Sequence, residues 1–236
     1  MTTPPLEILY EDNHLLAVSK PAGLPTMGTP QGKPTLLTIA KEYVKQKYGK
    51  PGNVYLGMMS RLDAPVTGVV LLARTSKAAR RLTQQFRTHA VEKAYWAIVE
   101  GTVEPPAGQC VDWVAPHERH RRMRIVGPKL PGAKEARLSY RRISTLGADS
   151  LLEIDLHTGR KHQIRLQLAH RGHPILGDRK YGSRRSWPSG IALHAQRLSI
   201  THPVQGTPLI FEAPLPDSWR NAGMPGSPLA ASPDSG

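Results

Sequence analysis

The chain has 236 residues, and its 32 Lys and Arg residues against 18 Asp and Glu residues give a formal net charge of +14. The length suits one sizeable domain, and so strong a positive charge indicates a polyanionic partner. No apolar run reaches membrane-spanning length, the N-terminus does not resemble a secretory signal, and no basic amphipathic helix carries aromatic residues on its apolar face. We therefore expect a nucleic acid, not a membrane, as the partner.

The single cysteine, Cys110, lies in a strand-like stretch. One thiol cannot form an internal disulfide or a thiolate zinc cluster. We expect a buried, inert thiol and a reducing, cytoplasmic location.

The N-terminal part predicts two strands at 6–10 and 15–19, which turn at Asp12 and Asn13. A stiff loop rich in Pro and Gly follows. Thr35 is a suitable N-cap for an amphipathic helix that extends to about residue 48.

A stretch from Gly57 to Arg74 combines a polar turn with an apolar run. Val69 to Ala73 is continuously apolar and rich in β-branched residues, which predicts a strand buried on both faces. Asp63 lies just before it, and Pro65 restricts the backbone beside this carboxylate. From the pattern alone, Asp63 either belongs to a plain turn or takes part in chemistry at the mouth of the strand.

The rest of the chain predicts more strands than helices. Ser76 is expected to cap a helix from Lys77 to about His89, with basic residues on its outer face. A short helix is expected at about 164–171, and residues 175–182 are expected to form a loop. The expected strands lie at about 92–101, 136–146, 150–156, 192–200 and 208–212. Because strands and helices do not alternate regularly, we expect an α+β fold with a mixed, mainly antiparallel central sheet flanked by helices.

Two polar clusters invite a functional interpretation. Residues 158–165 place three cations at a helix start, which predicts either a phosphate cradle or a well-capped surface helix. His157, His162, His170 and His173 suggest a metal site, but no cysteine or suitably spaced carboxylate accompanies them, so we expect none. The chain also lacks a phosphate-binding glycine motif for a nucleotide cofactor.

Five ordered blocks of the sequence resemble the motifs of the RluA-type pseudouridine synthases. The match covers roughly residues 6 to 219, and the fourth block is specific by itself. The blocks are ILYED (8–12) with VSKPAG (18–23); RLD (61–63) with TG (67–68); EKAYWAIVEG (92–101); TGRKHQIR (158–165) with AHRGHPILGD (169–178) and YG (181–182); and LHA (193–195) with HP (202–203) and APLP (213–216).

This resemblance implies a pseudouridine synthase fold with a catalytic cleft, and an enzyme that isomerises uridine in rRNA or tRNA to pseudouridine without a cofactor or metal. It implies that Asp63 is the catalytic carboxylate near ribose C1′, as nucleophile or as a charge that stabilises positive charge there. By the same resemblance, Arg165 keeps Asp63 ionised and Tyr95 contacts the uracil by stacking or proton transfer. The target base is expected to flip out of its stack.

The resemblance also sets expectations for RNA binding and domain limits. Residues 1–5 are expected to be a flexible N-terminus, 6–219 the catalytic domain and 220–236 a disordered tail. No room remains for the S4 domain of some relatives, so we expect the catalytic domain itself to bind RNA, through the helix at 77–87 and the basic segment at 117–137. We also expect a monomer. The candidate RNA-binding residues are Arg61, Arg160, Lys161, His162, Arg119, Arg121, Arg122 and Arg124.

The sequence departs from many family members beside Asp63, where Ser60 replaces a histidine and Ala64, Pro65 and Val66 replace other residues. These departures motivate an alternative, an RNA-binding or RNA-remodelling protein of the same fold with little catalysis. A basic DNA-binding protein is a third interpretation, but no helix-turn-helix signal supports it. The joint presence of Asp63, Tyr95 and Arg165 favours the enzyme.

Overall fold

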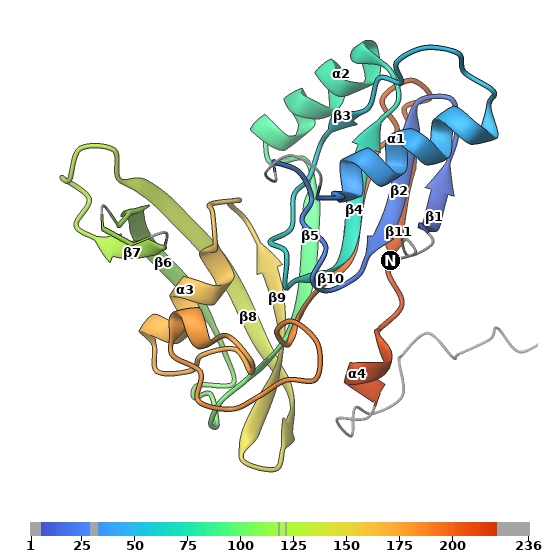
Figure 1. Ribbon diagram of the computed structural model, residues 1–236. Helices are drawn as coiled ribbons and strands as arrows, with labels where there is room; N and C mark the ends of the chain where they lie inside the picture. Colours follow the sequence, from blue (N-terminus) through green and yellow to red (C-terminus); the bar gives the residue numbers. More distant parts are fainter. Residues whose placement is uncertain (1–5, 29–32, 118, 121, 221–236) are drawn as a thin grey trace, which may run out of the picture.

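The computed structural model describes residues 6–28, 33–117, 119–120 and 122–220. The expected N-terminal segment at 1–5 lies outside the described residues. So does the expected tail at 220–236, except for residue 220. The strands form one sheet of 11 strands within the described ranges (Figure 1). The strands are β1 Glu7–Glu11, β2 Leu15–Lys20, β3 Gly57–Met58, β4 Thr67–Ala73, β5 Glu92–Val99, β6 Ala107–Pro116, β7 Met123–Val126, β8 Lys134–Leu146, β9 Asp149–Leu156, β10 Leu193–Thr201 and β11 Pro208–Glu212.

The sheet runs in the order β1-β2-β4-β10-β5-β9-β8-β6-β7, with β3 paired to β4 and β11 paired to β10. Among the described strands, β4 and β10 form a parallel pair and the other pairs are antiparallel. The predicted α+β fold with a mixed, mainly antiparallel sheet is therefore confirmed.

The helices lie on both halves of this sheet (Figure 1). They are α1 Leu36–Lys47, α2 Ser76–Arg87, α3 Gln163–His170, a 3-10 turn Arg179–Tyr181 and α4 Asp217–Arg220. None of the helices in the described ranges is both long and apolar enough to cross a bilayer.

Strand β4 is buried along its whole length because two helices pack against opposite faces of the sheet. Val70 and Leu72 join the cluster that contains Val44 of α1, whereas Val69 and Leu71 join the cluster that contains α2. Each fully buried Val or Leu side chain contributes about 1.5–3 kcal/mol relative to an exposed one. The apolar run of β4 therefore fixes the position of the loop that precedes it, which carries Asp63.

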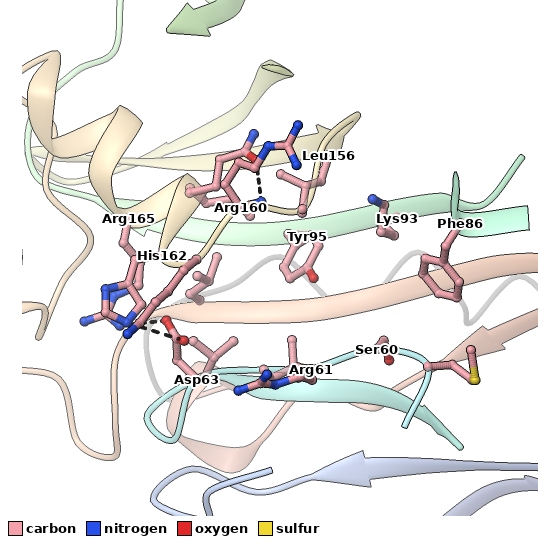
Figure 2. A pocket seen from close by; sticks show the side chains of 18 residues that line it. Ser60, Arg61, Asp63, Phe86, Lys93, Tyr95, Leu156, Arg160, His162 and Arg165 are labelled. Atoms are coloured by element: carbon pink, nitrogen blue, oxygen red, sulfur yellow. Dashed lines mark hydrogen bonds and ion pairs between the residues drawn. The ribbon is translucent and has the colours of Figure 1, made fainter. Parts of the chain in front are cut away.

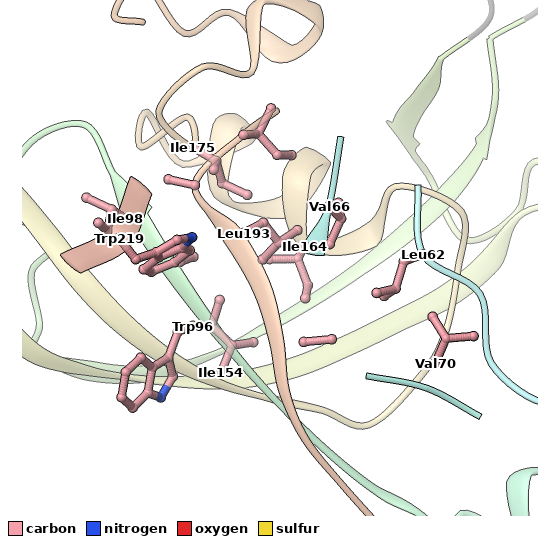
Figure 3. Close-up of a cluster of buried hydrophobic side chains, with 14 of the residues drawn as sticks. Leu62, Val66, Val70, Trp96, Ile98, Ile154, Ile164, Ile175, Leu193 and Trp219 are labelled. Atoms are coloured by element: carbon pink, nitrogen blue, oxygen red, sulfur yellow. The ribbon is translucent and has the colours of Figure 1, made fainter. Parts of the chain in front are cut away.

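The cluster that contains Val44 of α1 is the main hydrophobic core, and it extends from α1 to α3. Figure 3 shows Leu62 and Val66, which flank Asp63 in the sequence, in the same cluster as Ile164 of α3 and Leu193 of β10. The loop that carries Asp63 and the helix that carries Arg165 are therefore both fixed to one core.

Two local predictions need correction, and one short helix was not predicted. The N-cap of α2 is Thr75, not Ser76, because the backbone of Thr75 is extended and its hydroxyl accepts from the N–H of Ala78. The helix predicted at about 164–171 is confirmed, with bounds Gln163–His170. The loop predicted at 175–182 contains the 3-10 turn, and the short helix α4 was not predicted.

Candidate active site

A cavity of about 650 Å³ lies between the loop at 59–63, strand β5 and the residues at the start of α3 (Figure 2). Asp63, Tyr95 and Arg165 all line it, as do Arg61, Arg160, Lys161 and His162. The sheet brings these residues together because β4 and β5 both pair with β10.

The backbone on either side of Asp63 is fastened at several points. Thr26 Oγ1 donates to the carbonyl of Leu62 at 2.6 Å. The carbonyl of Ala64 accepts from the N–H of Gly23 at 2.8 Å and from Lys20 Nζ at 3.0 Å. Because these hydrogen bonds hold the residues on both sides of Asp63, the backbone position from which its carboxylate extends is fixed.

Lys20 is a buried residue that holds this loop in place through hydrogen bonds. Its side chain is 1 % exposed, and its ammonium also donates to the carbonyls of Pro21 and Leu24, both at 2.8 Å. Burial lowers the pKa of Lys20 to about 7, and the negative charge of Asp63 acts in the opposite direction. Lys20 therefore ties the loop at 21–24 to the loop of Asp63.

The carboxylate of Asp63 forms an ion pair with Arg165. Arg165 NH1 donates to Asp63 Oδ2 at 2.7 Å, and the Asp63 side chain keeps 28 % exposure. The other edge of the guanidinium binds Asp178 in bidentate geometry, from Nε at 2.7 Å and NH2 at 2.8 Å. Burial acts to lower the pKa of Arg165. The hydrogen bonds to Asp178 and Asp63, together with the charges of these carboxylates, outweigh burial and raise the pKa. The cleft thus holds a permanently charged guanidinium against Asp63.

His162 and Tyr181 support the other side of this ion pair. The Tyr181 hydroxyl lies 2.7 Å from His162 Nδ1 and accepts from the N–H of Met123 at 3.0 Å, so its proton is free to be donated to His162. His162 Nε2 is 3.6 Å from Asp63 Oδ1, beyond hydrogen-bond distance. Burial lowers the pKa of His162 to about 4, so the ring is neutral at neutral pH.

Tyr95 occupies the middle of the cavity wall on β5 (Figure 2). Burial, and secondly the charge of Asp63, raise the pKa of Tyr95, so its phenol keeps its proton at neutral pH. A planar aromatic face beside an ionised carboxylate can hold a flat, neutral base next to a developing positive charge.

The basic residues predicted to bind RNA fall into two groups. Arg61 and Lys161 are exposed at the cavity, and Arg160 is partly fixed because its Nε donates to the carbonyl of Glu135 at 2.8 Å. The second group lies outside the cavity lining, on and beside the β6–β7 hairpin, and comprises Arg119, Arg122 and Arg124. Arg121 lies outside the described residues.

Sequence reasoning assigned no role to Asp178, Tyr181 or Lys20. All three lie within the blocks that resemble the family, and that position was the available signal. The structure also gives Ser60 a local role, because its hydroxyl accepts from the N–H of Leu71 in β4 at 2.9 Å.

The four histidines considered as metal ligands do not gather into a metal-binding group. Within the described residues no three His, Cys, Asp or Glu side chains are arranged to hold a metal ion. Cys110 is buried as predicted, and burial raises its pKa to about 11.

Comparison with known proteins gives consistent matches. Residues 14–170 match the family model described as RNA pseudouridylate synthase. Ribosomal large subunit pseudouridine synthase D of Nitrosomonas europaea is 38% identical over 232 residues, which cover 90% of this chain and 63% of that protein. The tRNA pseudouridine synthase C of Salmonella typhimurium is 35% identical over 236 residues, which cover 92% of this chain and 88% of that protein. The chain therefore spans less than two thirds of the ribosomal relative's length.

A solved structure of human RNA pseudouridylate synthase domain containing 4 superposes with a TM-score of 0.76 at 26% identity, covering 92% of this chain and 91% of that one. The fold, the ordered motifs and these matches agree. The chain belongs to the RNA pseudouridylate synthase family, as an RluA-type member.

Proposed function

We propose that this chain isomerises a specific uridine in RNA to pseudouridine, with Asp63 as the catalytic carboxylate. The observation that carries the proposal is the Asp63–Arg165 ion pair beside Tyr95 in the cavity. The bond between ribose C1′ and uracil N1 breaks, the base turns over, and C1′ joins C5. N1 gains a proton and C5 loses one, so the reaction is balanced without an oxidant or reductant.

Each of the three residues takes one part in this reaction. Asp63 meets C1′, either as nucleophile or by stabilising positive charge there. Arg165 forms an ion pair with the carboxylate and orients it. Tyr95 contacts the uracil, either by stacking on the base or by proton transfer through its hydroxyl.

The target nucleotide reaches the cavity by flipping, and cations bind the neighbouring phosphates. We assign this role to Arg61, Arg160 and Lys161 at the cavity and to Arg119, Arg122 and Arg124 at the hairpin, and we extend it to Arg121 from the sequence alone. His162, which is neutral, would contribute an N–H hydrogen bond to a phosphate instead of a charge. Residues 6–219 form the catalytic domain in this proposal, acting as a monomer in the cytoplasm. The relatives' names indicate rRNA or tRNA as the substrate class.

Mapping of pseudouridines in cellular RNA, with and without this protein, tests the proposal. We expect at least one site to disappear without the protein and to return when purified protein acts on that RNA, with full activity in EDTA. RNA that binds the protein but gains no pseudouridine would contradict the proposal and favour the RNA-binding alternative.

A further inference from the structure

Lys93 lies in the cavity wall, and no described residue neutralises its charge. It lines the cavity together with Tyr95, from the same strand β5. No hydrogen bond or ion pair connects Lys93 to another residue of the described ranges, whereas Arg165 in the same cavity has two carboxylate partners. Burial lowers the pKa of Lys93, with no nearby carboxylate acting in the opposite direction.

The position of Lys93 relative to Tyr95 follows from strand geometry. Residues two apart on a strand face the same side, about 7 Å from each other. Figure 2 shows Asp63 at one end of the cavity, Tyr95 in the middle, and Lys93 with Phe86 towards the other end. Lys93 is thus displaced along the cleft from the place where the target base is expected, by a distance comparable to one nucleotide.

Phe86 supplies an apolar surface to the same cavity. It belongs to α2 and packs partly against the cluster that contains Leu82, while its ring also lines the cavity. A cavity that offers both an ammonium group and an aromatic ring suits a nucleotide, because the phosphate needs a cation and the base or ribose needs an apolar contact.

We propose that Lys93 binds a backbone phosphate next to the target uridine, and that Phe86 packs against the nucleotide that carries this phosphate. This inference deepens the proposed function and rests on it. An unpaired, partly buried ammonium is costly in the free protein, and a phosphodiester supplies the missing partner. The subsite would also hold the RNA in register while the target base occupies the space between Tyr95 and Asp63.

Binding of a fluorescent single-stranded oligouridylate of about ten nucleotides tests the proposal, because binding does not require turnover. Lys93→Gln should bind about tenfold more weakly at low salt. It should also lower the slope of log affinity against log salt by about 0.7, the value for one phosphate contact on a single strand. Lys93→Arg should restore the slope.

The matched control is Lys41→Gln, which removes the same charge from an exposed position on α1. It should change the slope little. Phe86→Leu should weaken binding without changing the slope, because it removes a ring and no charge. A slope for Lys93→Gln equal to that of wild type, in a variant with an unchanged melting temperature, would overturn the proposal.

A second test uses the RNA located by pseudouridine mapping, with a neutral methylphosphonate placed in turn at each linkage beside the target uridine. At one linkage the substitution should weaken wild-type binding about tenfold and leave Lys93→Gln unaffected. Equal losses for both proteins at every linkage would overturn the subsite. If wild-type protein forms no pseudouridine in any RNA, the proposed function fails, and the oligouridylate result still decides the role of Lys93.

Discussion

Arg165 is bound on two edges, and this arrangement sets the direction in which it faces Asp63. Two of its nitrogens donate to Asp178 and a third donates to Asp63. Asp178 is 1 % exposed, and a guanidinium held in bidentate geometry by a buried carboxylate has little freedom to turn. Asp178 is therefore a positioning residue, which acts on Asp63 through Arg165.

Asp178→Asn should lower turnover by about 100-fold, the scale of loss expected when a catalytic group is displaced by about 1 Å. The amide has one acceptor oxygen and places an N–H₂ group against the guanidinium, so Arg165 should turn away from Asp63. The KM for RNA should change little, because Asp178 is buried and does not line the cavity. Single-turnover and steady-state kinetics measure both quantities.

The control for a general loss of stability is Asp149→Asn. Asp149 is also buried and forms an ion pair with Arg185, but it does not line the cavity. Equal activity losses in the two variants would mean that Asp178 acts only through folding.

At this scale the sequence could predict the residues that the family motifs mark, Asp63, Tyr95 and Arg165, and the cavity brings them together. It could not predict the partners of these residues. Lys20 reaches the carbonyl of Ala64 only because β2 lies beside β4, and no local pattern encodes that contact.

At the scale of elements, the β6–β7 hairpin is connected to the candidate active site. The N–H of Met123, the first residue of β7, donates to Tyr181, whose hydroxyl contacts His162 at the cavity. RNA bound to the hairpin would therefore contact β7 or its neighbours, and β7 is hydrogen-bonded to the candidate active site through Tyr181.

Replacing Arg119, Arg122 and Arg124 with Ala should weaken RNA binding and flatten its salt dependence. For every phosphate that the variant no longer neutralises, the slope of log affinity against log salt should fall by about 0.7–0.9. Filter binding or fluorescence anisotropy over a series of salt concentrations measures this slope.

A charge-matched control replaces Lys41, Lys45 and Lys50, which are exposed on α1 and the turn after it. If both triple variants show the same slope, the hairpin arginines are ordinary solvated surface and the predicted contact is wrong.

Elements with strong patterns could be predicted, and weak ones could not. The apolar run of β4 and the cap of α1 by Thr35 are local signals, and both are confirmed. The short helix α4 carries little periodicity, and its Trp219 is 1 % exposed because the main core surrounds it, which is a tertiary cause.

At the scale of the whole molecule, the parallel pair of β4 and β10 joins β1, β2, β3 and β4 to the rest of the sheet. His194 is buried at this junction, with Nδ1 2.8 Å from Thr67 Oγ1 and Nε2 3.2 Å from the carbonyl of Ala213. Burial lowers the pKa of His194 to about 4, so the folded chain keeps this ring neutral.

Stability should therefore fall as the pH drops from about 6.5 to 4. In this range the unfolded chain binds a proton at His194 that the folded chain does not, so acid favours unfolding. At about 1.4 kcal/mol per pKa unit, the loss approaches about 3 kcal/mol. Denaturant unfolding of wild type and His194→Gln over this range should show a flatter pH dependence in the variant.

His170→Gln provides the comparison, because His170 is exposed at the end of α3. Its pH dependence should match that of wild type. A His194→Gln variant as steeply dependent on pH as wild type would contradict the assigned role of His194.

The central claim, that Asp63 performs the chemistry, is tested most directly by tritium release from RNA that carries 5-tritiated uridine. Formation of pseudouridine replaces the C5–H bond, so each turnover releases one tritium. Asp63→Asn keeps the side-chain shape but removes the charge that pairs with Arg165 and that we propose faces C1′. We predict that this variant binds RNA with wild-type affinity and releases no tritium above background. Substantial tritium release by Asp63→Asn would contradict the account.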